Sequence, residues 1–85
     1  MAWYFREVQY SSAVERKINA LHKTSIDDVA DALEGLDQAL CVEDHERGLR
    51  LFVRGHTPSG RRLNVFLYPV DVADGVWRLA TAYPD

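Results

Sequence analysis

The stretch from Leu49 to Tyr83 constrains this chain most, because apolar and polar residues alternate through it in three runs. A period of two is typical of a strand that is buried on one face only. The runs are Leu49–Arg54, Arg62–Tyr68 and Trp77–Tyr83. Together they predict three neighbouring strands with one apolar face.

Turn signals separate the three runs. Thr57-Pro58-Ser59-Gly60 matches a type I turn, with proline second and glycine fourth. Ala73-Asp74-Gly75 supplies the next turn, and Pro69 is expected to end its strand or to place it near an edge. Connections this short join antiparallel strands, so the runs predict a β-meander.

Two segments upstream carry helix signals. Ser12–Glu15 fits a capping box with Ser12 as the N-cap, and Ser25–Asp28 is a second N-cap signal. Gly35 offers a left-handed C-cap for the second helix. Helical spacing gives each segment one apolar side, formed by Val14, Ile18 and Leu21 in the first and by Ile26, Val29, Leu33 and Leu36 in the second.

Short strands are expected at Trp3–Gln9 and Gln38–Val42, which completes the order β-α-α-β-β-β-β. We therefore predict one α+β domain over residues 1–85, with two N-terminal helices packed on one face of an antiparallel meander of about four strands. A chain of this length buries only about 60% of its unfolded surface, so a partner or a second copy would help to stabilise it.

Several classes of protein are disfavoured. The chain has no apolar run near the roughly 20 residues of a membrane helix and no signal peptide, so we expect a cytoplasmic protein without membrane contact. Cys41 stands alone, and His45 is read as a solvated turn residue, because no second ligand lies at metal-binding spacing. No phosphate-binding glycine loop or nucleophile elbow occurs, so neither a metal nor a cofactor is expected.

The net charge of −3 conceals an asymmetry. Residues 24–46 contain eight acids and no lysine or arginine, whereas residues 47–85 contain six arginines against three acids. Such a division can indicate a basic binding face backed by an acidic, solvated one. The overall acidity argues against a general nucleic-acid-binding protein.

Alternation in the three runs assigns side chains to faces. If Leu51, Val65 and Trp77 face the helices, then Leu79, Thr81 and Tyr83 should join them. The opposite face should then gather four arginines with three aromatic rings: Arg50, Arg54, Arg62 and Arg78 with Phe52, Phe66 and Tyr68. Arginine forks bind phosphate and aromatic rings stack on bases, although both residue types also occur on ordinary solvated sheet faces.

His56 lies at the rim of the predicted hairpin. Histidine is the side chain that ordinarily titrates near neutral pH, so His56 is a candidate general acid or base. The alternative is an ordinary turn residue. His22 falls at the end of the first helix, where a C-terminal helix residue is the simpler interpretation.

Three segments resemble the BrnT-like toxins, small members of the RelE-type ribonuclease group. The segment from Leu21 to Val29 resembles their helix corner, with His22 at the histidine position. Two further matches are RLFVRGHT with GRRLNV, at residues 50–57 and 60–65, and WRLATA, at residues 77–82. The resemblance extends from about Tyr10 to Tyr83.

The resemblance implies a metal-independent ribonuclease toxin of a type II toxin–antitoxin-like pair, with RNA held on the open sheet face and a cognate antitoxin as partner. It implies phosphate contacts at Arg50, Arg62 and Arg78. Arg54, Phe66 and Tyr68 complete our candidate RNA-binding set. His56, Arg62 and Arg78 are the candidate catalytic residues, with His56 proposed from its own chemistry.

The chain departs from the family pattern at two basic positions. Tyr10-Ser11-Ser12-Ala13 replaces a segment that carries a lysine, and Tyr83 replaces a terminal arginine. These departures bear on catalysis more than on the fold. A non-catalytic interaction module, as a homodimer or completed by another small protein, therefore remains the alternative, with a regulator that binds nucleic acid without cutting as a third reading.

Overall fold

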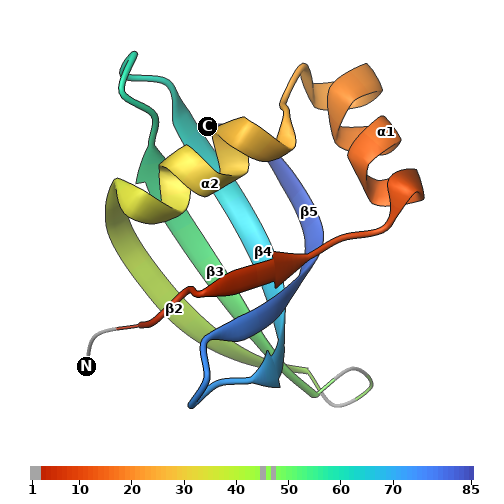
Figure 1. The fold of residues 1–85 in the computed structure, drawn as a ribbon, viewed down its shortest axis with the longest axis vertical. Helices are drawn as coiled ribbons and strands as arrows, with labels where there is room; N and C mark the ends of the chain where they lie inside the picture. The colour runs from red at the N-terminus through yellow and green to blue at the C-terminus, as the bar shows by residue number, and fades with distance from the viewer. Residues whose placement is uncertain (1–2, 45, 47) are drawn as a thin grey trace.

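A computed structural model describes residues 3–44, 46 and 48–85. The elements are β1 (Glu7–Gln9), α1 (Ser12–His22), α2 (Ile26–Glu34), β2 (Leu36–Asp44), β3 (Gly48–His56), β4 (Arg62–Asp71) and β5 (Val76–Pro84) (Figure 1). The predicted α+β class and element order are confirmed. The turn expected around His45 lies outside the described residues.

One sheet contains all five strands, in the order β1-β5-β4-β3-β2. Strands β2 to β5 form the predicted antiparallel meander. Strand β1 pairs with β5 in parallel, so the sheet is mixed and gains a fifth strand at its edge. Helix α2 lies across one face of the sheet, and α1 packs against β5 (Figure 1).

The core lies between α2 and the sheet. Its fully buried side chains come from alternate positions of β3, β4 and β5, together with Ile18 of α1 and Val29 of α2. Trp77 is the largest of them, and its indole nitrogen donates a hydrogen bond to the carbonyl of Tyr4 at 2.9 Å. This bond fixes the N-terminal segment over the core.

The helix ends follow the predicted chemistry with two corrections. Ser25 and Asp28 form the expected capping box at α2. The N-cap of α1 is Ser11 instead of Ser12, because the Ser11 hydroxyl accepts the bond from the backbone nitrogen of Val14. Gly35 is not left-handed, with φ at −92°. A Cβ there would lie 2.3 Å from the carbonyl oxygen of His56, so close packing explains this glycine.

Two predictions about the strands are wrong. Pro69 does not end β4, which continues to Asp71 and pairs Pro69 with Trp77 beside a register shift. A second shift leaves Ala80 as an extra residue in β5, because Phe66 pairs with Thr81 while Leu67 pairs with Leu79. This β-bulge reverses the alternation that follows it, so Ala82 is buried and Tyr83 lies on the opposite face.

Candidate functional site: the open sheet face

The side of the sheet opposite α2 is called the open face. It carries the second set of alternating side chains from three adjacent strands: Arg50, Phe52, Arg54 and His56 of β3; Arg62, Asn64, Phe66 and Tyr68 of β4; and Arg78, Thr81 and Tyr83 of β5. Every predicted site residue of the three strands therefore lies on one surface.

Aromatic rings form a row across the middle of the open face. Phe52 and Phe66 are a cross-strand pair with ring centroids 4.8 Å apart. Tyr83 stacks near Phe66 at 6.2 Å, and the imidazole of His22 follows at 5.9 Å from Tyr83. Part of this row holds the strands together, as cross-strand aromatic pairs do.

A hollow on one side of this row, where β3 ends and β4 begins, contains His56. It has a volume of about 500 Å³ and is lined by Asp37, Gln38, Arg54, His56, Gly60 and Arg62. His56 and Arg62 are direct partners in the β3–β4 register, so their side chains are neighbours. We call this the His56 hollow.

Asp37 orients the imidazole in this hollow. Nδ1 of His56 lies 3.0 Å from Oδ2 of Asp37. The carboxylate accepts a hydrogen bond from Nδ1–H, and in a neutral imidazole that carries its proton on Nδ1 the lone pair lies on Nε2. Among the described residues no side chain engages Nε2, so this nitrogen is available for proton transfer.

The two arginines of the His56 hollow differ in their surroundings. Arg54 donates to Oδ1 of Asn64 at 3.1 Å and lies 3.6 Å from Oδ1 of Asp85. Arg62 is exposed and, within the described part of the chain, its side chain has no ion-pair partner. Arg62 is therefore the cation that can meet an anion in this hollow with least competition.

A second hollow lies on the other side of the aromatic row, and Phe66 is part of its lining. Its volume is about 460 Å³, and its polar lining comes from Lys17 of α1 with Arg50, Tyr68, Arg78 and Thr81 of the sheet. We call this the Lys17 hollow. Three cationic side chains from separate elements meet there.

The helix corner that carries His22 is fixed by Arg61. Its guanidinium donates to Oδ2 of Asp28 at 3.2 Å, to the carbonyl of His22 at 3.1 Å and to Oγ1 of Thr24 at 3.2 Å. Lys23 turns the chain in the left-handed conformation, with φ at 48°. The corner is thereby attached to the β3–β4 turn, and the His22 ring is held beside Tyr83.

The structure separates the three candidate catalytic residues. His56 and Arg62 share one hollow, whereas Arg78 lines the other. At about 3.3 Å per residue, Arg62 and Tyr68, which adjoins Arg78, are about 20 Å apart along β4. Direct action of Arg78 on a group held by His56 is therefore not supported by this geometry.

Sequence reasoning missed Lys17, Asp37 and Tyr83. Lys17 follows Val14 by three residues, so the helical spacing would have shown it once α1 was known to pack beside β5. Asp37 precedes the strand that was expected to begin at Gln38, and β2 in fact begins at Leu36. Tyr83 was assigned to the wrong face because alternation gives no sign of a bulge.

Among the described residues, no three histidine, cysteine, aspartate or glutamate side chains lie close enough together to hold a metal ion. Neither of the two described helices has the length and apolar character needed to cross a membrane.

Comparison with solved structures finds a ribonuclease toxin whose fold is similar to that of this chain. No protein-family model matches this sequence, and no curated protein matches it. The crystal structure of the ribonuclease toxin BrnT of Brucella abortus is similar, with a TM-score of 0.67 and 14% sequence identity over 93% of this chain and 95% of that chain. The resemblance found in the sequence thus holds for the fold: this chain has the architecture of the BrnT toxin along nearly its whole length.

Proposed function

We propose that this chain is a metal-independent ribonuclease of toxin–antitoxin type that binds single-stranded RNA on its open face. The observation that carries the proposal is the placement of four arginines and a continuous aromatic row on one surface. Guanidinium groups bind phosphate through paired donors, and exposed bases stack on aromatic rings. The fold shared with a ribonuclease toxin supports this choice over a plain solvated face.

Within this proposal the two hollows have different tasks. The Lys17 hollow holds the RNA backbone through Lys17, Arg50 and Arg78, beside the ring of Tyr68. The His56 hollow carries the chemistry: His56 transfers a proton through Nε2, and Arg62 stabilises the charge that develops on the phosphate. Asp37 positions the imidazole. Arg54 contributes a further contact in the His56 hollow, and Phe66 contributes one in the Lys17 hollow.

A partner follows from the same proposal. A ribonuclease of this kind needs a cognate antitoxin or another small protein that suppresses its activity in the cell. The alternative function, a non-catalytic interaction module on this scaffold, requires no RNA cleavage at all.

The test is cleavage of a labelled single-stranded RNA by the purified chain in the presence of a metal chelator. We expect His56→Ala to lower the cleavage rate by about 10²- to 10⁴-fold while RNA binding is retained, because only proton transfer is lost. Arg62→Ala should weaken binding as well as cleavage. Arg16→Ala is the matched control, because Arg16 is exposed on α1 and lines neither hollow.

Two results would contradict the proposal. Full cleavage by His56→Ala would remove His56 from the mechanism. Absence of cleavage of any RNA by the unaltered chain, together with normal growth of bacteria that express it, would favour the interaction module.

A further inference from the structure

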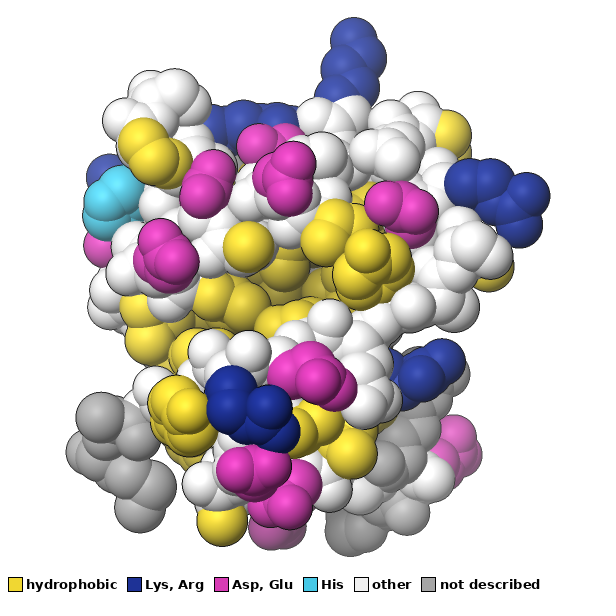
Figure 2. Space-filling model, in the orientation of Figure 1, with side chains coloured by type: hydrophobic (Ala, Val, Ile, Leu, Met, Phe, Trp, Pro, Cys, Tyr) yellow, Lys and Arg dark blue, Asp and Glu magenta, His cyan; other side chains and the backbone are white. Residues whose placement is uncertain are grey.

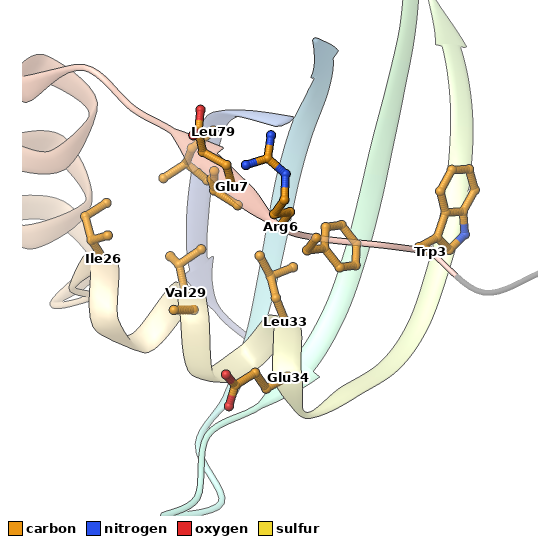
Figure 3. Close-up of a pocket in the computed structure, with 11 residues that line it drawn as sticks. Trp3, Arg6, Glu7, Ile26, Val29, Leu33, Glu34 and Leu79 are labelled. Carbon is orange, nitrogen blue, oxygen red and sulfur yellow. The ribbon is translucent and has the colours of Figure 1, made fainter. Parts of the chain in front are cut away.

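A second concave surface lies on the opposite side of the molecule from the open face. It is a groove of about 480 Å³ between the N-terminal segment and α2. Trp3, Phe5 and Val8 form one wall, and Ile26, Val29 and Leu33 of α2 form the other. Figure 2 shows the groove as an apolar hollow across the front of the molecule, and Figure 3 shows the side chains that line it.

Each wall is held in place independently of the other. On the N-terminal side, Arg6 donates to the carbonyl of Asp74 at 3.0 Å and pairs with its carboxylate at 2.6 Å. The backbone nitrogens of Arg6 and Glu7 also donate to the carbonyl of Gly75. On the other side, α2 is fixed by its capping box and by close contact with the sheet. The groove is therefore preformed, which lowers the entropic cost of filling it.

The rim of the groove is acidic. Of the residues that line the groove, Glu7 is exposed on the N-terminal wall and Glu34 is exposed on α2. Among the described residues that line the groove, Arg6 is the only cation, and its charge is engaged by Asp74, whose hydrogen bond and charge raise the pKa of Arg6. An apolar floor with a negative rim favours a ligand that is apolar on one side and positively charged beside it.

The acidic rim also indicates which kind of molecule the groove can bind: RNA, a second copy of this chain, or a separate protein. An RNA backbone would be repelled by the rim. A second copy of this chain, placed face to face by a twofold axis, would bring the same acids together. A separate partner protein with basic residues meets neither obstacle.

We propose that this groove binds a short, basic amphipathic helix of a partner protein. Its apolar side chains, at the i, i+3 or i+4 spacing of one helix face, enter the groove, and its lysines or arginines lie against Glu7 and Glu34. Helix α2 is about 13 Å long at about 1.5 Å per residue, which matches about two turns of a helix laid beside it. The proposal does not depend on RNA cleavage.

The test is selection of random 15-residue peptides displayed on phage against the immobilised full chain, followed by measurement of Kd for the enriched peptides. We expect enriched sequences to carry more lysine and arginine than aspartate and glutamate, with apolar residues at helical spacing. Ala30→Lys should weaken their binding at least tenfold, because Ala30 is exposed in the groove and the new charge would oppose the peptide.

Ala20→Lys is the matched control, since Ala20 is exposed on α1 and lies outside the groove. Glu34→Lys provides a second variant, which should also weaken peptide binding.

Absence of enrichment, enrichment of acidic peptides, or equal binding to Ala30→Lys would overturn the proposal. A concentration-dependent dimer that Ala30→Lys dissociates would overturn it too, because the occupant would then be a second copy. Cleavage of RNA by Ala30→Lys should be unchanged, so failure here is distinct from failure of the ribonuclease proposal.

Discussion

Arg61 and Arg62 are adjacent in the sequence but have different surroundings in the structure. Arg61 is half-buried and donates three hydrogen bonds to the α1–α2 corner, whereas Arg62 is exposed on the open face. Alternation in β4 predicted the position of Arg62. Nothing in the sequence indicated that Arg61 would reach back to Asp28 and His22, because these contacts join residues that are 33 and 39 positions apart in the chain.

Arg61→Ala should destabilise the fold by about 1–3 kcal/mol, because the variant removes the donors that satisfy a corner carbonyl and a partly buried carboxylate. Urea unfolding measures this difference. Arg62→Ala, one residue away and exposed, should change the free energy of unfolding by less than about 0.5 kcal/mol. Equal loss of stability in both variants would show that the corner does not depend on Arg61.

Alternation along each strand predicted which side chains share the open face. It could not predict the contacts that those side chains make with other strands and helices. The positions of Arg50, Arg54 and Phe66 on one face follow from a period of two. The pairing of His56 with Asp37 joins two strands whose relative register the sequence does not state. Lys17 reaches the same surface only because α1 packs beside β5.

At the scale of elements, close approach of α2 to the sheet depends on glycine. A Cβ on Gly55 would lie 1.9 Å from the carbonyl oxygen of Ala32, so β3 and α2 touch backbone to backbone. The sequence predicted both elements and their order. It did not predict this contact, because a glycine inside a strand has several explanations.

Gly55→Ala should therefore destabilise the protein by about 3 kcal/mol or more, because α2 must move away from β3 to admit the methyl group. Thermal unfolding monitored by circular dichroism measures the effect. Gly48→Ala is the control: its φ is +77°, and among the described residues other than its chain neighbours no atom lies within 4 Å of the new methyl group, so only the backbone cost of about 1–2 kcal/mol is expected. A smaller effect at Gly55 than at Gly48 would contradict the packing described.

The bulge at Ala80 is a feature of β5 that the sequence did not predict. Strict alternation placed Tyr83 with the core, but the inserted residue moves it onto the open face beside Phe66. The shift also brings Ala82 into the core. A bulge depends on how two strands pair, so it cannot be predicted from the alternation of one strand alone.

At the scale of the whole molecule, opposite surfaces carry opposite charge. The open face holds the arginines of β3, β4 and β5, while α2 exposes acids on the other side. This explains how a chain with a net charge of −3 can still offer a basic surface. The charge asymmetry read from the sequence corresponds in part to this division: the exposed acids of α2 lie opposite the arginines, whereas Asp37 of the same acidic stretch lies beside His56 on the open face.

The same division separates the two proposed binding events. RNA would occupy the open face, and a basic partner helix would occupy the groove beside α2. The groove and the Lys17 hollow share one lining residue, Leu79, whereas Ala30 lines only the groove and Arg78 lines only the hollow, so each surface can be altered without change to the other. This independence lets one experiment locate the RNA on the molecule.

That experiment is an NMR titration of the isotope-labelled chain with a short single-stranded RNA. We predict that the side-chain signals of Phe66, Tyr68 and Arg78 shift on RNA addition, while the indole signal of Trp3 and the amide signal of Ala30 do not. Shifts confined to Trp3 and Ala30, or no shift at any RNA concentration, would contradict the assignment of the open face as the RNA-binding surface.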